Sequence, residues 1–217
     1  GQRRVAGDAR ILEIGCGTGL LTRHIRARWP AAELVASDLS PDMVGAAARG
    51  AMIAGTFLPM DGEAPAFEGP WFDLILSSLA FQWFTDLPGA VARLAALLRP
   101  GGSLIFSTMG ADSFAEWRAA HDAAGAHPGT PAYPSLAELR AMLAVYPDAF
   151  AFEEHWPHDF GDARAFLAHL KAIGATIPAS GHAALTPARL RAVMRAFDKS
   201  GGTATYHVLF GRVTRAG

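Results

Sequence analysis

The spacing of apolar positions divides the first half of the chain into short apolar runs that alternate with helical patterns. Five runs have the length and composition of strands: residues 11–14, 33–38, 51–59, 72–78 and 103–108. Apolar residues recur at intervals of three and four in segments between these runs, most clearly at residues 18–28, 41–49 and 88–99. Strands that alternate with helices predict an α/β fold with a doubly wound, mostly parallel sheet.

After residue 108 the regular alternation ends. The later pattern predicts helices at residues 114–124, 136–145, 163–173 and 187–198, and strands at 150–160, with a break at Pro157, and at 203–213. We therefore expect one domain over residues 1–217 with a seven-stranded sheet. Its first half is residues 1–109, a helical cap at 110–200 is inserted before or between the last strands, and residues 201–217 hold the final strand.

Composition and charge exclude several classes of protein. A net charge of −1 argues against nucleic-acid binding, and no apolar run approaches the roughly 20 residues of a membrane helix. No secretion signal is recognisable at the N-terminus, so we expect a cytoplasmic protein. The single cysteine, Cys16, excludes an internal disulfide, and the scattered histidines give no zinc pattern, so no metal is predicted.

The first apolar run ends in a turn with three alternating glycines, Gly15, Gly17 and Gly19, directly before a helical pattern. A glycine turn between a buried strand and a helix is typical of a nucleotide-type site, because side chains there would collide with a ligand on the backbone. The dinucleotide pattern would require a third glycine at Leu20. The alternative is a turn that serves packing alone.

Acidic residues follow the next two predicted strands. Asp38 lies about 20 residues beyond the glycine turn, where an acid accepts hydrogen bonds from ribose hydroxyls; capping the following helix is the alternative. Asp61 and Gly62 follow the third strand and are placed to meet an adenine amino group, although they are equally typical of a plain turn. Met43 lies close enough to cover a purine face.

A polar residue beside an aromatic one, Gln82 and Trp83, follows the fourth strand. Ligands bind at the carboxyl ends of strands in open α/β sheets, so these two side chains are candidates for a substrate wall. A tryptophan that only packs is the alternative.

Four separated motifs together resemble the class I S-adenosylmethionine methyltransferases: the glycine turn with Glu13 two residues upstream, Asp38, Asp61, and the Arg99-Pro100-Gly101-Gly102 segment. The resemblance implies S-adenosylmethionine as the cofactor. It also implies a set of cofactor-binding residues: Glu13, Gly15, Gly17, Gly19, Asp38, Leu39, Met43, Asp61, Gly62 and Ser77.

A closer resemblance extends over nearly the whole chain. Residues 77–83 (SSLAFQW), 170–176 (LKAIGAT), Leu185-Thr186 and Thr205-Tyr206-His207 are similar to the malonyl-[acyl-carrier protein] O-methyltransferases of biotin synthesis. Ser78 departs from that family, which usually has asparagine there. The resemblance implies methylation of a free carboxylate without a catalytic acid or base. The implied substrate-positioning residues are Gln82, Trp83, Lys171, Tyr206 and His207, although Lys171 also fits a solvated lysine at the edge of its helix.

The resemblance also implies acyl carrier protein as the partner that brings the substrate. Arg191, Arg195 and Lys199 share one side of the helix predicted at 187–198 and form a basic stripe that an acidic carrier would fit; a solvated face is the alternative. Two other functions remain open at this point. One is a carboxyl methyltransferase for a free small diacid such as aconitate, and the other is a non-catalytic S-adenosylmethionine-binding protein.

Overall fold

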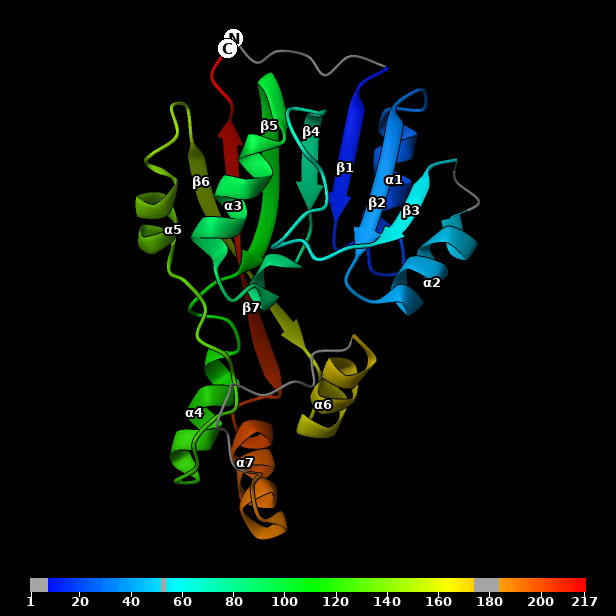
Figure 1. Ribbon diagram of the computed structural model, residues 1–217. Coiled ribbons are helices and arrows are strands. Elements are labelled where there is room, and N and C mark those ends of the chain that lie inside the picture. The colour runs from blue at the N-terminus through cyan, green and yellow to red at the C-terminus, as the bar shows by residue number, and fades with distance from the viewer. Residues whose placement is uncertain (1–7, 52–53, 174–183) are drawn as a thin grey trace. The chain divides into compact units, whose positions relative to one another are not determined.

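The computed structural model in Figure 1 describes residues 8–51, 54–173 and 184–217. Its seven strands lie in the order β3-β2-β1-β4-β5-β7-β6. The strands are β1 (Arg10–Ile14), β2 (Glu33–Asp38), β3 (Thr56–Pro59), β4 (Phe72–Ser77), β5 (Leu98–Met109), β6 (Phe150–Asp159) and β7 (Thr203–Thr214). The strands from β3 to β5 pair in parallel. The predicted doubly wound, mostly parallel sheet is confirmed.

The last strands of the sheet run antiparallel to their neighbours. The N–H of Gly101 in β5 donates to the carbonyl of Arg215, just beyond the end of β7. The N–H of Gly110, just beyond the end of β5, donates to the carbonyl of His207 within β7, so β5 and β7 run in opposite directions. Phe160 beyond the end of β6 likewise donates to Gly202 before the start of β7.

The helices are α1 (Leu20–Arg28), α2 (Pro41–Ala51), α3 (Leu87–Ala96), α4 (Ala115–Ala123), α5 (Leu136–Leu143), α6 (Ala163–Ala172) and α7 (Pro187–Lys199), with a 3-10 turn η1 (Phe81–Trp83). Along the chain, α4 and α5 precede β6, and α6 and α7 lie between β6 and β7. Helices are thus inserted before and between the last two strands, as predicted. Thr186 caps α7, since its hydroxyl accepts from the Arg189 N–H. Among the described residues, no helix is both long and apolar enough to cross a membrane.

Strand β1 is buried on both faces because helices lie on both sides of it. Its residue Ile11 packs in a cluster with Ile25 of α1, whereas Leu12 packs in a cluster with Leu94 of α3. Because successive side chains of a strand point to opposite faces, α1 and α3 cover opposite faces of the sheet. Glu13 shares the α1 face with Ile11.

The chain divides into two compact units. The first unit holds residues up to 108 with 136–152 and 209–217; the second holds 109–135 and 153–208. The core of the second unit is aromatic: Trp117 of α4, Phe166 of α6 and Phe197 of α7 contact one another with ring centroids 5.3–5.4 Å apart. This core fixes the three cap helices against one another.

Several predicted boundaries were wrong, among them the start of the fifth strand, which was predicted at 103 but lies at Leu98. The third strand begins at Thr56 rather than 51, since α2 continues to Ala51. The helix predicted to reach Arg99 ends at Ala96, and Leu98 already pairs with Phe72 as part of β5. The predicted break at Pro157 is absent from β6, because β6 is an edge strand and its proline needs no partner for a missing N–H.

Candidate active site

The glycine turn joins β1 to α1 through three residues with left-handed backbone, Gly15 (φ 71°), Gly17 (φ 51°) and Gly19 (φ 84°). A Cβ on Gly15 would lie 2.3 Å from the Cβ of Ala80, so packing excludes any side chain there. A Cβ on Gly17 would have no described atom within 4 Å. A Cβ on Gly19 would lie 3.3 Å from Ala47, so of the three glycines only Gly17 has open space beside its backbone, where a ligand can approach.

Asp38 ends β2, and two backbone groups hold its carboxylate. Oδ2 accepts from the Gly17 N–H and Oδ1 from the Ser40 N–H, both at 2.9 Å. A carboxylate accepts about four hydrogen bonds, so each oxygen keeps a lone pair for another donor. The structure thus fixes Asp38 beside the open glycine with acceptor capacity left for hydroxyl groups.

Glu13 is a buried acid at the base of the same turn. It is 0% exposed, and neither carboxyl oxygen makes a hydrogen bond of normal geometry within the described chain. The pKa of Glu13 is raised to about 7, chiefly by burial; hydrogen bonding by the Thr22 hydroxyl and N–H opposes this rise, and the negative charge of Asp38 adds to it. A buried carboxyl without a partner is a natural neighbour for a cationic group of a ligand.

Cys16 lies between the first two glycines and is buried. Burial raises the pKa of its thiol to about 12, and the charges of Glu13 and Asp38 act in the same direction. A thiol that stays protonated is a poor nucleophile, which agrees with a packing role for Cys16.

Apolar side chains stand exposed after the carboxyl ends of β2 and β4. Leu39 is 73% exposed and Met43 of α2 is also exposed. Trp83 of η1 is 45% exposed. Exposed apolar residues at the ligand-binding edge of a parallel sheet suit the apolar parts of a ligand.

The other predicted donor residues shape this edge of the sheet, and among them Asp61 is exposed. Asp61 turns the chain after β3, since its Oδ1 accepts from the Glu63 N–H. A Cβ on the buried Gly62 would lie 2.6 Å from Ile14 Cγ2. The hydroxyl of Ser77 donates to the Ile14 carbonyl across 2.9 Å and joins the ends of β4 and β1.

Sequence reasoning did not single out the backbone of Leu79. Its φ of 51° places it in the left-handed region, where a leucine is strained, and its N–H contacts the Ser107 hydroxyl at 3.1 Å. Gln82 Nε2 donates to the Leu79 carbonyl at 2.5 Å, while no bond within the described residues reaches its buried Oε1. Strain of this kind leaves no signal in the sequence, because it depends on the neighbouring strand.

The remaining candidates belong to the second unit. Tyr206 and His207 are neighbours on β7 and therefore point to opposite faces. Tyr206 packs against Phe114, and burial raises its pKa; its buried hydroxyl has no hydrogen bond among the residues described. His207 is 2% exposed and its Nε2 lies 3.0 Å from Glu153 Oε2. Lys171 is exposed near the end of α6.

Comparisons with known proteins agree with this geometry. Residues 11–102 match the methyltransferase domain family. The chain is 47% identical, over 94% of its length, to the biotin biosynthesis bifunctional protein BioCD of Bordetella avium, and spans 43% of that longer protein. It is 40% identical, over 95% of its length, to the malonyl-[acyl-carrier protein] O-methyltransferase of Magnetococcus marinus, and covers 78% of it.

The fold is also that of known structures. The YcgJ protein of Bacillus subtilis superposes with a TM-score of 0.67 over 99% of this chain and 95% of that one, at 18% identity, and therefore supports the fold alone. The domain match and the curated relatives confirm the expected enzyme class and its methyl donor, S-adenosylmethionine. The chain belongs to the malonyl-[acyl-carrier protein] O-methyltransferase family.

Proposed function

We propose that this chain transfers a methyl group from S-adenosylmethionine to the free carboxylate of a malonyl thioester on acyl carrier protein. The observation that carries the proposal is the extent of the similarity. The methyltransferase-domain match ends at residue 102, but relatives named for this activity are 40% and 37% identical over 95% of the chain. The similarity therefore includes the second unit, where we expect substrate selection.

The donor side of the proposal rests on the glycine turn. Bound S-adenosylmethionine supplies an electrophilic methyl group on a positively charged sulfur. The open backbone of Gly17 gives the ligand room to approach, and the free lone pairs of Asp38 suit two ribose hydroxyls. Glu13, buried without a hydrogen-bond partner of normal geometry in the described chain, suits the ammonium group of the donor's amino-acid part.

The remaining donor contacts are proposed at the rim of this site. Leu39 and Met43 offer exposed apolar surface to the adenine, and Asp61 keeps Oδ2 for its amino group while Oδ1 holds the turn. Gly62 lets the chain pack closely against Ile14, and Ser77 bonds the Ile14 carbonyl, so both support the end of β1 next to the glycine turn.

The acceptor chemistry requires little of the protein. A carboxylic acid has a pKa near ~4, so the nucleophile is already ionised at neutral pH and no general base is needed. The protein has to desolvate the carboxylate and align it with the methyl group at about 3–3.5 Å. Too strong a hold by cations would lower the nucleophilicity of the carboxylate.

We propose Gln82, Trp83, Lys171, Tyr206 and His207 as substrate-positioning residues. Among them, Tyr206 has the hydroxyl best suited to donate to a carboxylate. Burial raises its pKa, so it stays protonated at neutral pH, and its buried oxygen bonds no group among the described residues. Gln82 fixes its amide on the Leu79 carbonyl and so holds its side chain in one orientation.

The carrier protein is proposed to dock on the basic stripe of α7, formed by Arg191, Arg195 and Lys199. All three side chains are exposed, whereas Val193 and Phe197 on the other side of the helix are buried. An acidic carrier would be attracted and oriented by such a face. The cytoplasmic location expected from the sequence stays a prediction.

A substrate panel with labelled donor tests the proposed activity. We expect methyl transfer to malonyl-carrier protein, and no transfer to acetyl-carrier protein, which has the same thioester arm without the free carboxylate. Transfer to free malonate or aconitate at equal efficiency would favour the small-diacid alternative. Donor binding without turnover of any carboxylate would contradict the enzymatic proposal.

The pH dependence gives a second test of the acceptor. Single-turnover rates at saturating malonyl-carrier protein should be flat from about pH 6 to 8, because the nucleophile ionises near ~4. A tenfold rise per pH unit would indicate a hydroxyl or amine acceptor instead.

A further inference from the structure

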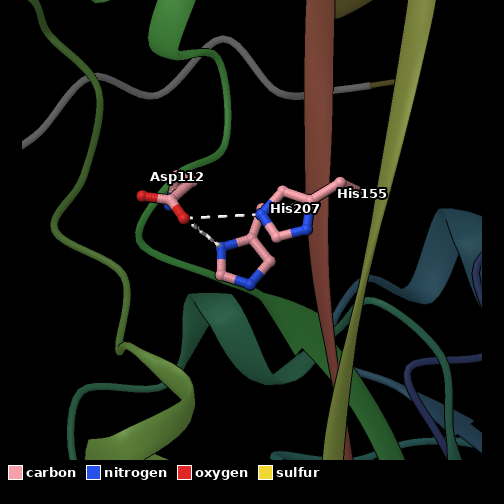
Figure 2. A group of neighbouring side chains, drawn as sticks. All are labelled: Asp112, His155 and His207. Carbon is pink, nitrogen blue, oxygen red and sulfur yellow. Dashed lines mark hydrogen bonds and ion pairs between the residues drawn. The ribbon is translucent and has the colours of Figure 1, made fainter.

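Three side chains from distant parts of the second unit converge at one point. Asp112 follows β5, His155 lies on the edge strand β6 and His207 on β7. One ligand atom from each lies within 4.8 Å of the others. Figure 2 shows both imidazole rings beside the Asp112 carboxylate, with a dashed line from the carboxylate to each ring.

The distances suit a metal ion. Asp112 Oδ2 lies 3.4 Å from His155 Nε2 and 3.7 Å from His207 Nδ1. Ligand atoms about 2.0–2.2 Å from a tetrahedral zinc ion are separated by about 3.3–3.6 Å. Both separations therefore come close to those of a coordinated ion, and the exposed Asp112 and His155 side chains can adjust to close the remainder.

The buried histidine is held in the tautomer that a metal ligand needs. His207 Nε2 lies 3.0 Å from Glu153 Oε2, and the Asp112 N–H donates to His207 Nδ1 at 3.0 Å. A carboxylate accepts and an N–H donates, so both contacts put the proton on Nε2 and leave the lone pair on Nδ1. A carboxylate that orients a histidine through its other nitrogen is the usual support of metal-binding histidines.

The backbone around the cluster is fixed in advance. The Gly110 N–H and the Ser113 hydroxyl both donate to the His207 carbonyl, and the His207 N–H donates back to the Ser113 hydroxyl. A Cβ on Gly110 would lie 2.5 Å from His207 Nδ1, so only glycine fits beside this nitrogen. These bonds keep Asp112 and His207 together in the free protein.

We propose that Asp112, His155 and His207 form a binding site for a divalent transition-metal ion such as Zn²⁺ or Co²⁺. Two imidazole nitrogens favour these ions over Mg²⁺ and Ca²⁺, which prefer oxygen ligands. The ion takes the Nδ1 lone pair that the Asp112 N–H uses in the metal-free protein, so binding exchanges one hydrogen bond for coordination. All three ligands belong to the second unit, and His207 is also one of the proposed substrate-positioning residues, so a bound ion would hold that side chain in place.

Sequence spacing could not reveal this site. Its ligands lie 43 and 52 residues apart along the chain, and their convergence follows from the antiparallel pairing of β7 with both β5 and β6. No zinc pattern was predicted because local patterns of histidine and cysteine were the only signal available.

Titration of the full chain with Co²⁺, followed by its visible absorption, tests the proposal. We expect one Co²⁺ per chain, displaced by one equivalent of Zn²⁺. The variants His155→Gln and Asp112→Asn should each bind at least tenfold more weakly. His24→Gln removes an exposed histidine of α1 in the first unit and should bind Co²⁺ like the wild type. Circular dichroism confirms that each variant is folded.

A wild-type measurement keeps the test valid if a variant fails to fold. One equivalent of Zn²⁺ should shift the imidazole resonances of His155 and His207 and leave those of His24 in place. Equal affinity in the wild type, His155→Gln and Asp112→Asn would overturn the proposal. Loss of affinity in His24→Gln, or a zinc-induced shift at His24 alone, would overturn it as well.

Discussion

The two units hold their candidate residues by different means. In the first unit the backbone fixes the site: Gly17 and Ser40 donate N–H groups to Asp38, and left-handed glycines shape the turn. In the second unit, the His207 ring has a side chain on one nitrogen, the Glu153 carboxylate, and a backbone group on the other, the Asp112 N–H. The position of Asp38 thus requires no particular partner side chain, whereas that of the His207 ring requires a carboxylate 54 residues away in the sequence. Four predictions compare the two units, three on the first and one on the second.

The largest effect is expected on stability, where two glycines of the same turn should respond differently to substitution by alanine. Gly15→Ala brings a Cβ 2.3 Å from the Cβ of Ala80 and places an alanine in the left-handed backbone region. We therefore expect the free energy of unfolding to fall by about 2–4 kcal/mol. Gly17→Ala meets no such clash and should lower it by only about 1 kcal/mol, yet weaken donor binding. Urea unfolding and calorimetric donor titration measure the two effects.

Equal destabilisation by the two substitutions would contradict this division of the turn. Gly69→Ala is a matched control, because Gly69 also has a left-handed backbone, with φ of 74°, and open space at its Cβ, but lies outside the turn. It should match Gly17→Ala in stability and leave donor affinity unchanged.

The next effect concerns Glu13, whose pKa is about 7 in the folded chain against an ordinary value of 4.5. Between these values the folded state keeps a proton that the unfolded state has lost, so stability falls as the pH rises through this window and levels off above it. The shift corresponds to an upper limit of about 3 kcal/mol. Glu13→Gln cannot ionise and should be about 1–3 kcal/mol more stable than the wild type at pH 8, with weaker donor binding.

Denaturant unfolding of both proteins from pH 4 to 8 measures this difference, which should vanish near pH 4. Glu33→Gln on the exposed start of β2 serves as a control and should give no comparable change. A wild-type stability that rises between pH 4.5 and 7, with no relative gain for Glu13→Gln, would show that Glu13 ionises without hindrance.

Asp38→Ala should weaken donor binding by about tenfold to a hundredfold, or ~1.5–3 kcal/mol, because two ribose hydroxyls lose their acceptor. Calorimetric titration with S-adenosylmethionine measures the change. Asp42→Ala, four residues along the chain and exposed in the first turn of α2, should leave the affinity near that of the wild type. Unchanged affinity in Asp38→Ala would exclude the proposed orientation of the donor.

The smallest effect is expected in the second unit. Changing Arg191, Arg195 and Lys199 together to glutamine should raise KM for malonyl-carrier protein severalfold, weaken its salt dependence and leave a carrier-free malonyl thioester nearly unaffected. Changing Arg23, Arg28 and Arg49, which are exposed in the first unit, removes the same charge and is the control. Equal loss on both substrates would indicate damage to the fold, and an unchanged KM would place the carrier elsewhere.

The sequence was most informative where structure depends on local periodicity. Strand β2 and the start of α7 at Pro187 agree with their predicted positions, because apolar spacing and a capping threonine define them locally. Leu98 was assigned to a helix because it continues the apolar spacing of α3, although pairing with Phe72 draws it into β5. Tertiary pairing thus overrode a local pattern.

The candidate site follows the same rule. The glycine turn and Asp38 could be located from contiguous residues, and the structure brings them together through the Gly17–Asp38 hydrogen bond. The strain at Leu79 and the surroundings of His207 could not be predicted, because both depend on residues of neighbouring strands such as Ser107 and Glu153. Their roles in the reaction stay predictions.

The raised pKa of Cys16 has a consequence for the chemical durability of an enzyme that handles an alkylating agent. With a pKa of about 12, only about one thiol in 10⁵ is ionised at pH 7, against about one in a hundred for an ordinary pKa of 9.0. The sulfur that lies in the turn proposed to bind the methyl donor is therefore rarely present as the thiolate that would attack a methyl group. The same burial that withholds this cysteine from catalysis is thus expected to protect it from the methyl donor.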